Sequence, residues 1–549
     1  MRLTEDCSVS WIWRTIAAVV FAVVAVAQDC GVAQASPPSR VYGFFTSWSV
    51  YARNYHIDDV PAKDLTHLVY MPANVVAGRI ALGDPYADVD KFYPGDSWAV
   101  GALRGSFRRM QLLKARHPHL RTLISIGGAN NSDGFSAAVA DSPARTTFVQ
   151  SIVDFVVLYD FDGVDINWEY PGSGPNPADP LNYTLFLQEL RGALDQKAAQ
   201  LQRKFELTID VPPDRARIAK LDLAKIAPLV DSMQVMAYDY FVPQSQPGNT
   251  RVQHHAPLFT VTADPLPAPY SSEFHVAWSI DHYLALGVPN HKLGLGLALY
   301  GRGYAGVSGG QQGLFGTYTG PMSQGTWAPG IFDYSDLEAN YVGRSGYQRV
   351  FDPEQRAPRL IDAAMGNVIM YEDVTSIEEK AWQLRSRALG AAMVWELSND
   401  RSGKLVGALR AATLRPALST PVASVSVARP AAVPMRLDGA APRGARLFFI
   451  TLCFGDPRPG LPLPGDVLPI ALDPFMVAML GQLGSPLFPG SVGLLDQNGQ
   501  ASASLRLDLV PSLPPELLGQ RMRAAAWVLT GSGGLTGEAT NALTLPFVN

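Results

Sequence analysis

Two kinds of apolar pattern alternate from Arg40 to about Ala411. Short apolar runs of about four to eight residues predict buried strands, whereas longer segments with apolar positions three and four apart predict helices. The predicted strands cover residues 41–46, 65–71, 120–126, 163–169, 205–211, 233–237, 293–299 and 391–395. The predicted helices cover residues 107–116, 145–159, 185–201, 221–229, 276–286 and 377–389. Strands that mostly alternate with helices predict an α/β fold, here a parallel (β/α)8 TIM barrel over residues 40–411.

Three stretches depart from this alternation. Residues 303–367 are rich in Gly and Tyr and predict an α+β insertion between the seventh and eighth strands. Residues 412–445, mostly Ala, Pro, Ser and Val with few charges, predict a linker. Residues 446–549 contain short β-type runs and a hairpin signal at Asn498-Gly499, so we expect a C-terminal all-β domain resembling a sandwich.

The N-terminal segment has the layout of an export signal. Arg2 and Arg14 precede an apolar stretch over residues 16–27, and possible cleavage sites with the small-x-small pattern end at Ala27 and at Ala35. The apolar stretch is short for a membrane span. We therefore expect residues 1–35 to be a signal peptide and the protein to be secreted to the extracellular space or the periplasm, without stable insertion in a membrane.

Composition and charge narrow the possible partners. The 549 residues are 47% hydrophobic and 17% charged, with a net charge of −5 and no basic run, so nucleic acid is not an expected partner. No Cys and His residues have the spacing of a metal site. We expect a monomer that requires neither a metal nor another cofactor.

The strongest chemical signal lies between residues 160 and 171. Apolar and polar residues alternate from Val164 to Trp168, which places Asp165, Asn167 and Glu169 on one face of the predicted strand. A row of polar groups on a buried face costs stability unless they are satisfied or used. A carboxyl at the end of such a row can have a raised pKa and donate a proton near neutral pH, so Glu169 is the candidate general acid.

This segment resembles the catalytic signature of family 18 glycoside hydrolases, the chitinase family, which reads Asp-Gly-x-Asp-x-Asp-Trp-Glu-Tyr-Pro. Asn167 stands at the third Asp of that signature. Further segments at the ends of predicted strands resemble other motifs of the family, and the resemblance extends from residue 41 to about 408. They are Ser125-Ile126-Gly127-Gly128, Met236-Ala237-Tyr238-Asp239, Tyr300-Gly301-Arg302-Gly303 and Trp395-Glu396. Their order and their places at strand ends argue against chance.

The resemblance implies a substrate-assisted, retaining hydrolysis of β-1,4-linked N-acetylglucosamine. In this scheme Glu169 protonates the glycosidic oxygen, and the substrate's own acetamido oxygen attacks to give an oxazolinium intermediate. Tyr238 holds the acetamido group for attack, and Asp239 contacts the distorted sugar.

Other residues of the motifs would support the reaction or bind sugar. The resemblance implies that buried Asp165 orients position 167, with support from Ser125. Trp395 would stack on the apolar face of the sugar. Trp48, near the end of the first strand, has either a stacking role or a core role. The remaining expected substrate-binding residues are Met236, Tyr300 and Arg302.

Three positions differ from the family pattern. Asn167 retains an accepting carbonyl but brings no charge where the family Asp offsets the intermediate's positive charge, and its amide can donate to Asp165. Phe44 replaces a supporting Tyr, and Ala129 replaces a Trp that stacks on a sugar. Because Glu169 is retained, we expect an enzyme with reduced turnover.

The sequence thus predicts a secreted chitinase-type glycoside hydrolase whose partner is chitin or N-acetylglucosamine-containing oligosaccharides. One alternative is a catalytically weak chitinase-like lectin that binds these sugars, although lectin-like relatives commonly lose the residue at Glu169. Another is an endo-β-N-acetylglucosaminidase that acts on N-glycans or peptidoglycan, since both contain the same sugar.

Overall fold

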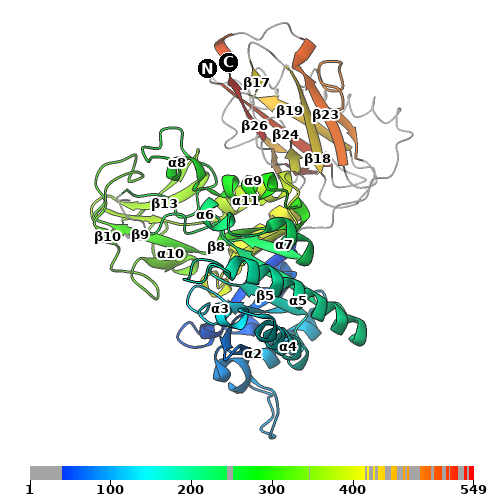
Figure 1. Cartoon of the computed structure of the whole chain (residues 1–549). Helices are drawn as coiled ribbons and strands as arrows, with labels where there is room; N and C mark the ends of the chain where they lie inside the picture. Colours follow the sequence, from blue (N-terminus) through cyan, green and yellow to red (C-terminus); the bar gives the residue numbers. More distant parts are fainter. Residues whose placement is uncertain are drawn as a thin grey trace. The chain divides into compact units, whose positions relative to one another are not determined.

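The structure of the protein is a computed structural model (Figure 1). It describes residues 40–243, 251–344 and 346–414, and shorter stretches at 417–419, 425–426, 431–438, 447–453, 461–463, 466–468, 482–495, 500–509, 515–517, 520–529, 537–540 and 543–548. The chain forms two compact units, which divide between residues 412 and 413, with residues 385–387 grouped with the second unit. The expected signal peptide, residues 1–35, lies outside the described residues.

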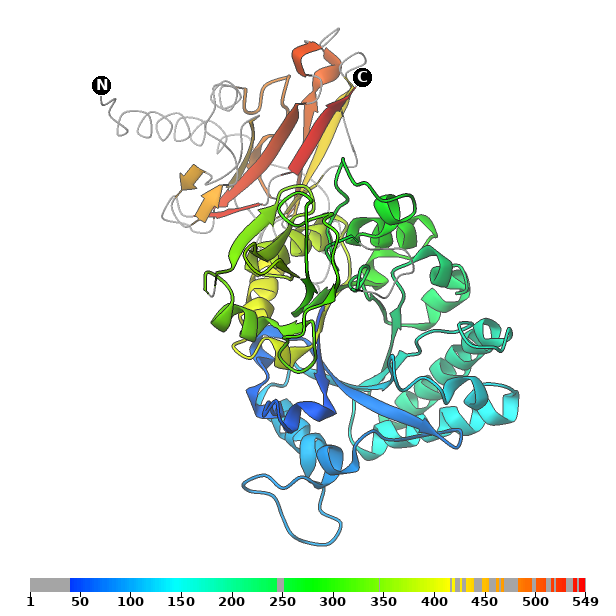
Figure 2. The same ribbon diagram turned by 90° about the vertical axis from the view of Figure 1, so that its left-hand side faces the viewer.

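Parallel strands close into a barrel in the first unit. They are β1 (Arg40–Thr46), β2 (His67–Val76), β4 (Arg121–Gly127), β5 (Gly163–Asn167), β6 (Glu206–Val211), β7 (Ser232–Val235), β8 (Leu293–Ala298) and β15 (Ala391–Trp395). Each strand pairs in parallel with its neighbours, and β15 pairs with β1 to close the ring, which Figure 2 shows from its open end. A further strand, β3 (Arg79–Leu82), pairs antiparallel with β2. The predicted (β/α)8 barrel is confirmed.

Helices surround the ring of strands. They are α2 (Gly105–Arg116), α3 (Phe135–Ala138), α4 (Ser142–Leu158), α5 (Asp179–Leu201), α6 (Arg215–Ile218), α7 (Leu223–Leu229), α8 (Tyr270–Glu273), α9 (Val276–Ala285), α11 (Val374–Ser386) and α12 (Lys404–Leu414). Side-chain caps fix where several of them begin: Asp141 accepts from the backbone N–H of Ala144 at 2.9 Å, before α4. Asp214 does the same for Arg217 at 3.1 Å, before α6.

The alternation in β5 separates two environments. Val164 and Ile166 are fully buried in the main apolar core, whereas Asp165 and Asn167 are buried on the opposite face of the strand, inside the barrel. The strand ends at Asn167, two residues earlier than predicted. Trp168 still joins the apolar layer, because its ring stacks on Phe135 with 5.1 Å between centroids.

The α+β insertion between the seventh and eighth barrel strands is also present. It consists of β9 (Tyr300–Ala305), β10 (Gly320–Pro321), β11 (Ile331–Asp333), α10 (Tyr334–Asn340), β12 (Gln348–Asp352), β13 (Ala357–Asp362) and β14 (Asn367–Met370). Its antiparallel sheet has the order β10-β9-β14-β13-β12, and β11 pairs with β9. The sheet begins at Tyr300, so the Tyr-Gly-Arg segment lies on its first strand.

Most of the described stretches of the second unit are strands. They are β16 (Ala417–Ser419), β17 (Val425–Ser426), β18 (Ala432–Asp438), β19 (Leu447–Cys453), β20 (Leu461–Leu463), β21 (Asp466–Leu468), β22 (Val492–Leu494), β23 (Gln500–Arg506), β24 (Arg521–Leu529), β25 (Gly537–Ala539) and β26 (Leu543–Val548). One sheet has the order β16-β18-β23, and another has the order β17-β26-β24-β19-β22 with β25 beside β24.

The boundary of this unit differs from the sequence prediction. Composition predicted a linker over residues 412–445, but β18 lies inside that range and pairs with β23 along its whole length. Val433, Met435 and Leu437 are buried, and they alternate with the period of a strand. Composition obscured this alternation because Ala and Pro surround it.

Candidate active site

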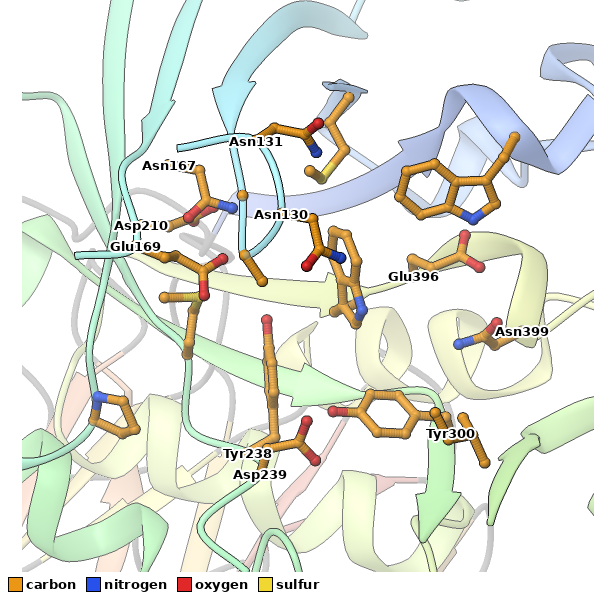
Figure 3. A pocket seen from close by; sticks show the side chains of 18 of the residues that line it. Asn130, Asn131, Asn167, Glu169, Asp210, Tyr238, Asp239, Tyr300, Glu396 and Asn399 are labelled. Atoms are coloured by element: carbon orange, nitrogen blue, oxygen red, sulfur yellow. The ribbon is translucent and has the colours of Figure 1, made fainter. Parts of the chain in front are cut away.

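A pocket of about 470 Å³ lies at the carboxyl ends of the barrel strands, where TIM-barrel active sites occur. The expected site residues that line it are Trp48, Asn167, Glu169, Met236, Tyr238, Asp239, Tyr300, Arg302 and Trp395. The other two, Asp165 and Ser125, are fully buried and do not line it. Ten of the lining residues are labelled in Figure 3.

Asp165 is held from both neighbouring strands. Its Oδ2 accepts from the hydroxyl of Ser125 at 2.7 Å, and its Oδ1 accepts from the hydroxyl of Thr208 at 2.6 Å. These three residues stand level with one another on β4, β5 and β6. Burial raises the pKa of Asp165, and the two hydroxyl donors oppose that rise by stabilising the carboxylate.

A second carboxyl, Asp210 on β6, contacts Asp165 and was missed by the sequence analysis. The two buried carboxyl groups interact electrostatically, and each affects the pKa of the other. The sequence carried a weak signal, because Asp210 follows Thr208 by two positions on an apolar strand and therefore faces the same way. Burial raises the pKa of Asp210 well above its usual range, and the charges of Asp165 and Glu169 raise it further.

Asn167 is fixed by its backbone and offers its side chain to the pocket. Its backbone oxygen accepts from the N–H of Gly128 at 2.7 Å. Its side chain lowers the pKa of the neighbouring Glu169 carboxyl. The hydrogen bond to Asp165 that the sequence suggests is absent from the described residues, where Asp165 accepts from Ser125 and Thr208 instead. Within the described part of the chain, its buried Oδ1 has no hydrogen-bond partner. A buried acceptor at a pocket wall is available to a donor on a ligand.

Glu169 is the second residue after β5 and points into the pocket (Figure 3). Its backbone N–H donates to the hydroxyl of Ser132 at 3.0 Å. Burial raises the pKa of Glu169, and the effects of Tyr170, Arg217 and Asn167 oppose that rise. A carboxyl with a raised pKa retains its proton closer to neutral pH, which suits a general acid.

Asp239 is kept ionised by its neighbours. Arg302, on β9 of the insertion, donates from Nε to its Oδ1 at 2.9 Å and from Nη2 to its Oδ2. His255 Nδ1 lies 3.4 Å from the same Oδ1. Burial favours protonation of Asp239, but Arg302 and His255 outweigh burial and hold the pKa below its usual range.

Tyrosines stand beside this carboxylate. The ring of Tyr238 lies 6.3 Å from that of Tyr300, edge to face. The Tyr238 hydroxyl points toward the pocket (Figure 3). It donates a weak hydrogen bond to the sulfur of Met393 at 3.9 Å. Burial raises the pKa of Tyr238 well above its usual range, so the hydroxyl remains a hydrogen-bond donor.

Tryptophans line the pocket from two other elements. Trp395, at the end of β15, packs against Phe44 with 5.7 Å between ring centroids. Trp48 lies on the short helix η1 (Ser47–Val50) and is 41% exposed. Of its two possible roles, the core role is therefore wrong, and its ring is accessible to a ligand.

A polar cluster at the pocket wall was also missed. Arg53 Nη1 lies 2.7 Å from Asp333 Oδ2 and 3.7 Å from Glu396 Oε1. Burial raises the pKa of Glu396 to about 7. The ring of Trp327, which is 48% exposed, lies 5.1 Å from the Arg53 guanidinium. Of Arg53, Asp333 and Glu396, only Glu396 belongs to a motif recognised in the sequence, Trp395-Glu396.

Two features are absent from the described residues. No helix in them is long and apolar enough to cross a membrane. The same residues contain no group of three or more His, Cys, Asp or Glu side chains arranged to hold a metal ion.

Comparisons with known proteins agree on one family. Residues 40–400 match Glycosyl hydrolases family 18. Chitinase A1 of Niallia circulans is 36% identical over 69% of this chain, and the match spans 59% of that relative's length. Endochitinase 1 of Metarhizium anisopliae is 32% identical over 66% of this chain and 81% of its own. Among solved structures, chitinase ChiA74 from Bacillus thuringiensis is 25% identical and covers 93% of this chain and 85% of its own, with a TM-score of 0.65.

Proposed function

The chain belongs to glycosyl hydrolase family 18, and we propose that it is a chitinase that hydrolyses β-1,4 linkages between N-acetylglucosamine units with retention of configuration. The observation that carries the proposal is Glu169, a carboxyl of raised pKa that lines the pocket beside the side chains of Asn167 and Tyr238. This arrangement supplies a proton donor together with groups that can hold an acetamido substituent.

The hydrolysis would use the substrate's own acetamido group as nucleophile. Glu169 donates its proton to the glycosidic oxygen as the bond to the anomeric carbon breaks. The acetamido oxygen forms the new bond to that carbon, and water later opens the intermediate with Glu169 as base. Tyr238 would donate to the acetamido oxygen, and the free Oδ1 of Asn167 would accept from the acetamido N–H. The unpaired acceptor on Asn167 supports this placement.

The remaining pocket residues would bind the sugar rings. Trp395 and the exposed ring of Trp48 offer apolar faces on which pyranose rings stack. Asp239, held as a carboxylate by Arg302, would accept from a sugar hydroxyl. The apolar segment over residues 16–27 further supports export from the cell, as part of the same proposal.

Glu169→Gln tests the assignment. The amide keeps the shape of the side chain but has no proton to transfer, so we expect hydrolysis of chitooligosaccharides to fall by at least about a hundredfold. Binding, measured by calorimetry, should change by only a few-fold. Glu338→Gln, at an exposed ion pair with Lys404, is the matched control and should retain full activity.

The same assay separates the alternatives. Binding without release of reducing ends in the wild type would indicate the lectin. Cleavage of an N-glycoprotein or peptidoglycan but not of chitooligosaccharides would indicate the other hydrolase. Near-normal activity in Glu169→Gln would refute Glu169 as the acid.

A further inference from the structure

The pairing of β5 with β6 sets Asp210 beside the position where the polar row of β5 lacks a carboxyl. Asp165 stands opposite Thr208, and Ile166 opposite Ile209. One step further in the same register, Asn167 and Asp210 are level. Figure 3 shows Asn167, Asp210 and Glu169 grouped at one side of the pocket. A carboxyl absent from β5 is thus present at the same depth on the neighbouring strand.

Asp210 also joins the carboxyl beneath it. It is 4% exposed, lines the pocket and interacts electrostatically with Asp165, which is fully buried. Two buried carboxyl groups that interact in this way are more stable when they share one proton, so that the pair carries one negative charge. Asp165 also accepts from Ser125 and Thr208. The buried Oδ1 of Asp210 has no hydrogen-bond partner within the described residues.

We propose that Asp210 supplies from β6 the carboxyl that position 167 lacks, and that the Asp165–Asp210 pair carries one shared proton and one negative charge to the pocket wall beside Glu169. Asp210 is then a positioning residue for the proton transfer by Glu169. This inference rests on the proposed glycosidase function. It also removes the reason for expecting reduced turnover, because the charge missing at Asn167 is carried by the neighbouring strand.

The pair would act in the same step as Glu169. As the O–H bond of Glu169 breaks, its proton passes to the glycosidic oxygen, and positive charge develops on the sugar and its acetamido group. The pair keeps its own proton throughout, and its negative charge stabilises the cation in a site sheltered from water. The same charge opposes ionisation of Glu169 and keeps that acid protonated to higher pH.

A substitution at position 210 removes the charge of Asp210 and leaves the side chains around it in place. Asp165, Tyr183, Tyr238 and Glu169 interact with it electrostatically. Burial raises the pKa of both tyrosines well above the usual range, so they stay neutral near pH 7. Arg217 and Asp239 act on Glu169. Those two are unchanged by a substitution at 210, which provides a clean comparison.

Asp210→Asn is the central test, because the amide fills the same space and can still donate to Asp165 but cannot carry charge. We expect kcat on chitooligosaccharides to fall at least about tenfold with KM changed only a few-fold. The alkaline limb of the kcat profile should move to lower pH, because the remaining charge is confined to the more distant Asp165.

Asn167→Asp provides the rescue. In the Asp210→Asn background it returns a carboxyl partner to Asp165 from β5, so kcat and the alkaline limb should recover toward the wild type. In the wild-type background it adds a third buried carboxyl and should give no gain. Wild-type kinetics in Asp210→Asn, or a double variant no better than Asp210→Asn, would overturn the proposal.

A measurement without turnover separates this inference from the proposed function. At neutral pH, the infrared difference spectrum between the wild type and Asp210→Asn should contain one band of a protonated carboxyl. That band in a wild type that cleaves no chitooligosaccharide would reject the glycosidase but support the shared proton. Its absence would overturn the shared proton, whatever the activity.

Discussion

At the scale of single residues, the charge of the cleft is determined by a contact between strands. Asn167 offers a hydrogen-bond acceptor to a ligand, since within the described residues its Oδ1 has no partner. Asp210 brings a carboxyl to the same level from β6. The absence of a charge at position 167 is therefore a poor guide to turnover in this chain, because hydrogen bonding and charge reside on two different residues.

Tyr238→Phe addresses the acetamido contact proposed above. The hydroxyl should tighten its hydrogen bond as the acetamido oxygen attacks, so its removal should lower kcat about tenfold or more and change KM less. Initial rates over a range of chitooligosaccharide concentrations measure both constants. Tyr86→Phe, at a tyrosine that is 49% exposed, is the control and should match the wild type. An effect on KM alone would restrict Tyr238 to substrate binding.

At the scale of elements, the end of β4 depends on glycine. Gly127 and Gly128 have φ of +101° and +105°, a conformation that L side chains rarely adopt. A Cβ at Gly127 would lie 2.4 Å from the backbone oxygen of Asn167. This close approach lets Gly128 donate to that oxygen and holds Asn167 at the pocket wall.

Gly127→Ala should therefore disturb both the fold and the site. Positive φ alone costs about 1–2 kcal/mol for a residue with a Cβ, and the contact with Asn167 adds to that cost. Gly78→Ala is the matched control, because Gly78 has φ of +71° but open space around it. Denaturant unfolding should give a clearly larger loss of stability for Gly127→Ala. Equal losses would mean that the β4 end accommodates the methyl group.

At the scale of the whole molecule, the first unit has its own core and its own pocket. The barrel strands and the insertion contribute every residue that lines the pocket, together with the loops between residues 40 and 400. Leu405, Val406 and Leu409 of α12 are buried, and the barrel unit includes this last helix as far as Ala412. The boundary between the units therefore lies one residue beyond the predicted end at 411.

A chain that ends after Leu414 should fold and should keep full activity on soluble chitooligosaccharides, because no pocket residue is removed. A chain that ends after Gly403 is the control: it lacks α12, exposes the core that this helix covers, and should be insoluble or unstable. Circular dichroism, thermal melting and the reducing-end assay provide the readouts. Aggregation of the longer chain would show that the barrel unit requires the rest of the protein.

Local pattern determined much of this protein. The barrel strands were predicted to within about five residues, because each is a short apolar run bounded by turns. The helices between them were recognised because their apolar residues recur every three or four positions. Glu169 was also evident from sequence, since the motif around it is contiguous and the alternation in β5 directs it inward. These features depend on residues that are close together in the chain.

Only the tertiary structure decided what those residues meet. Asp210 became part of the site because β5 and β6 pair in one register, and a shift of one residue would turn it outward. Arg53 contacts Asp333, which is 280 positions further along the chain, and Glu396, which lies further still. The strand at 432–438 is a strand because β23, far along the chain, pairs with it. A local pattern alone does not determine such contacts, since they depend on the pairing of distant segments rather than on the preference of either one.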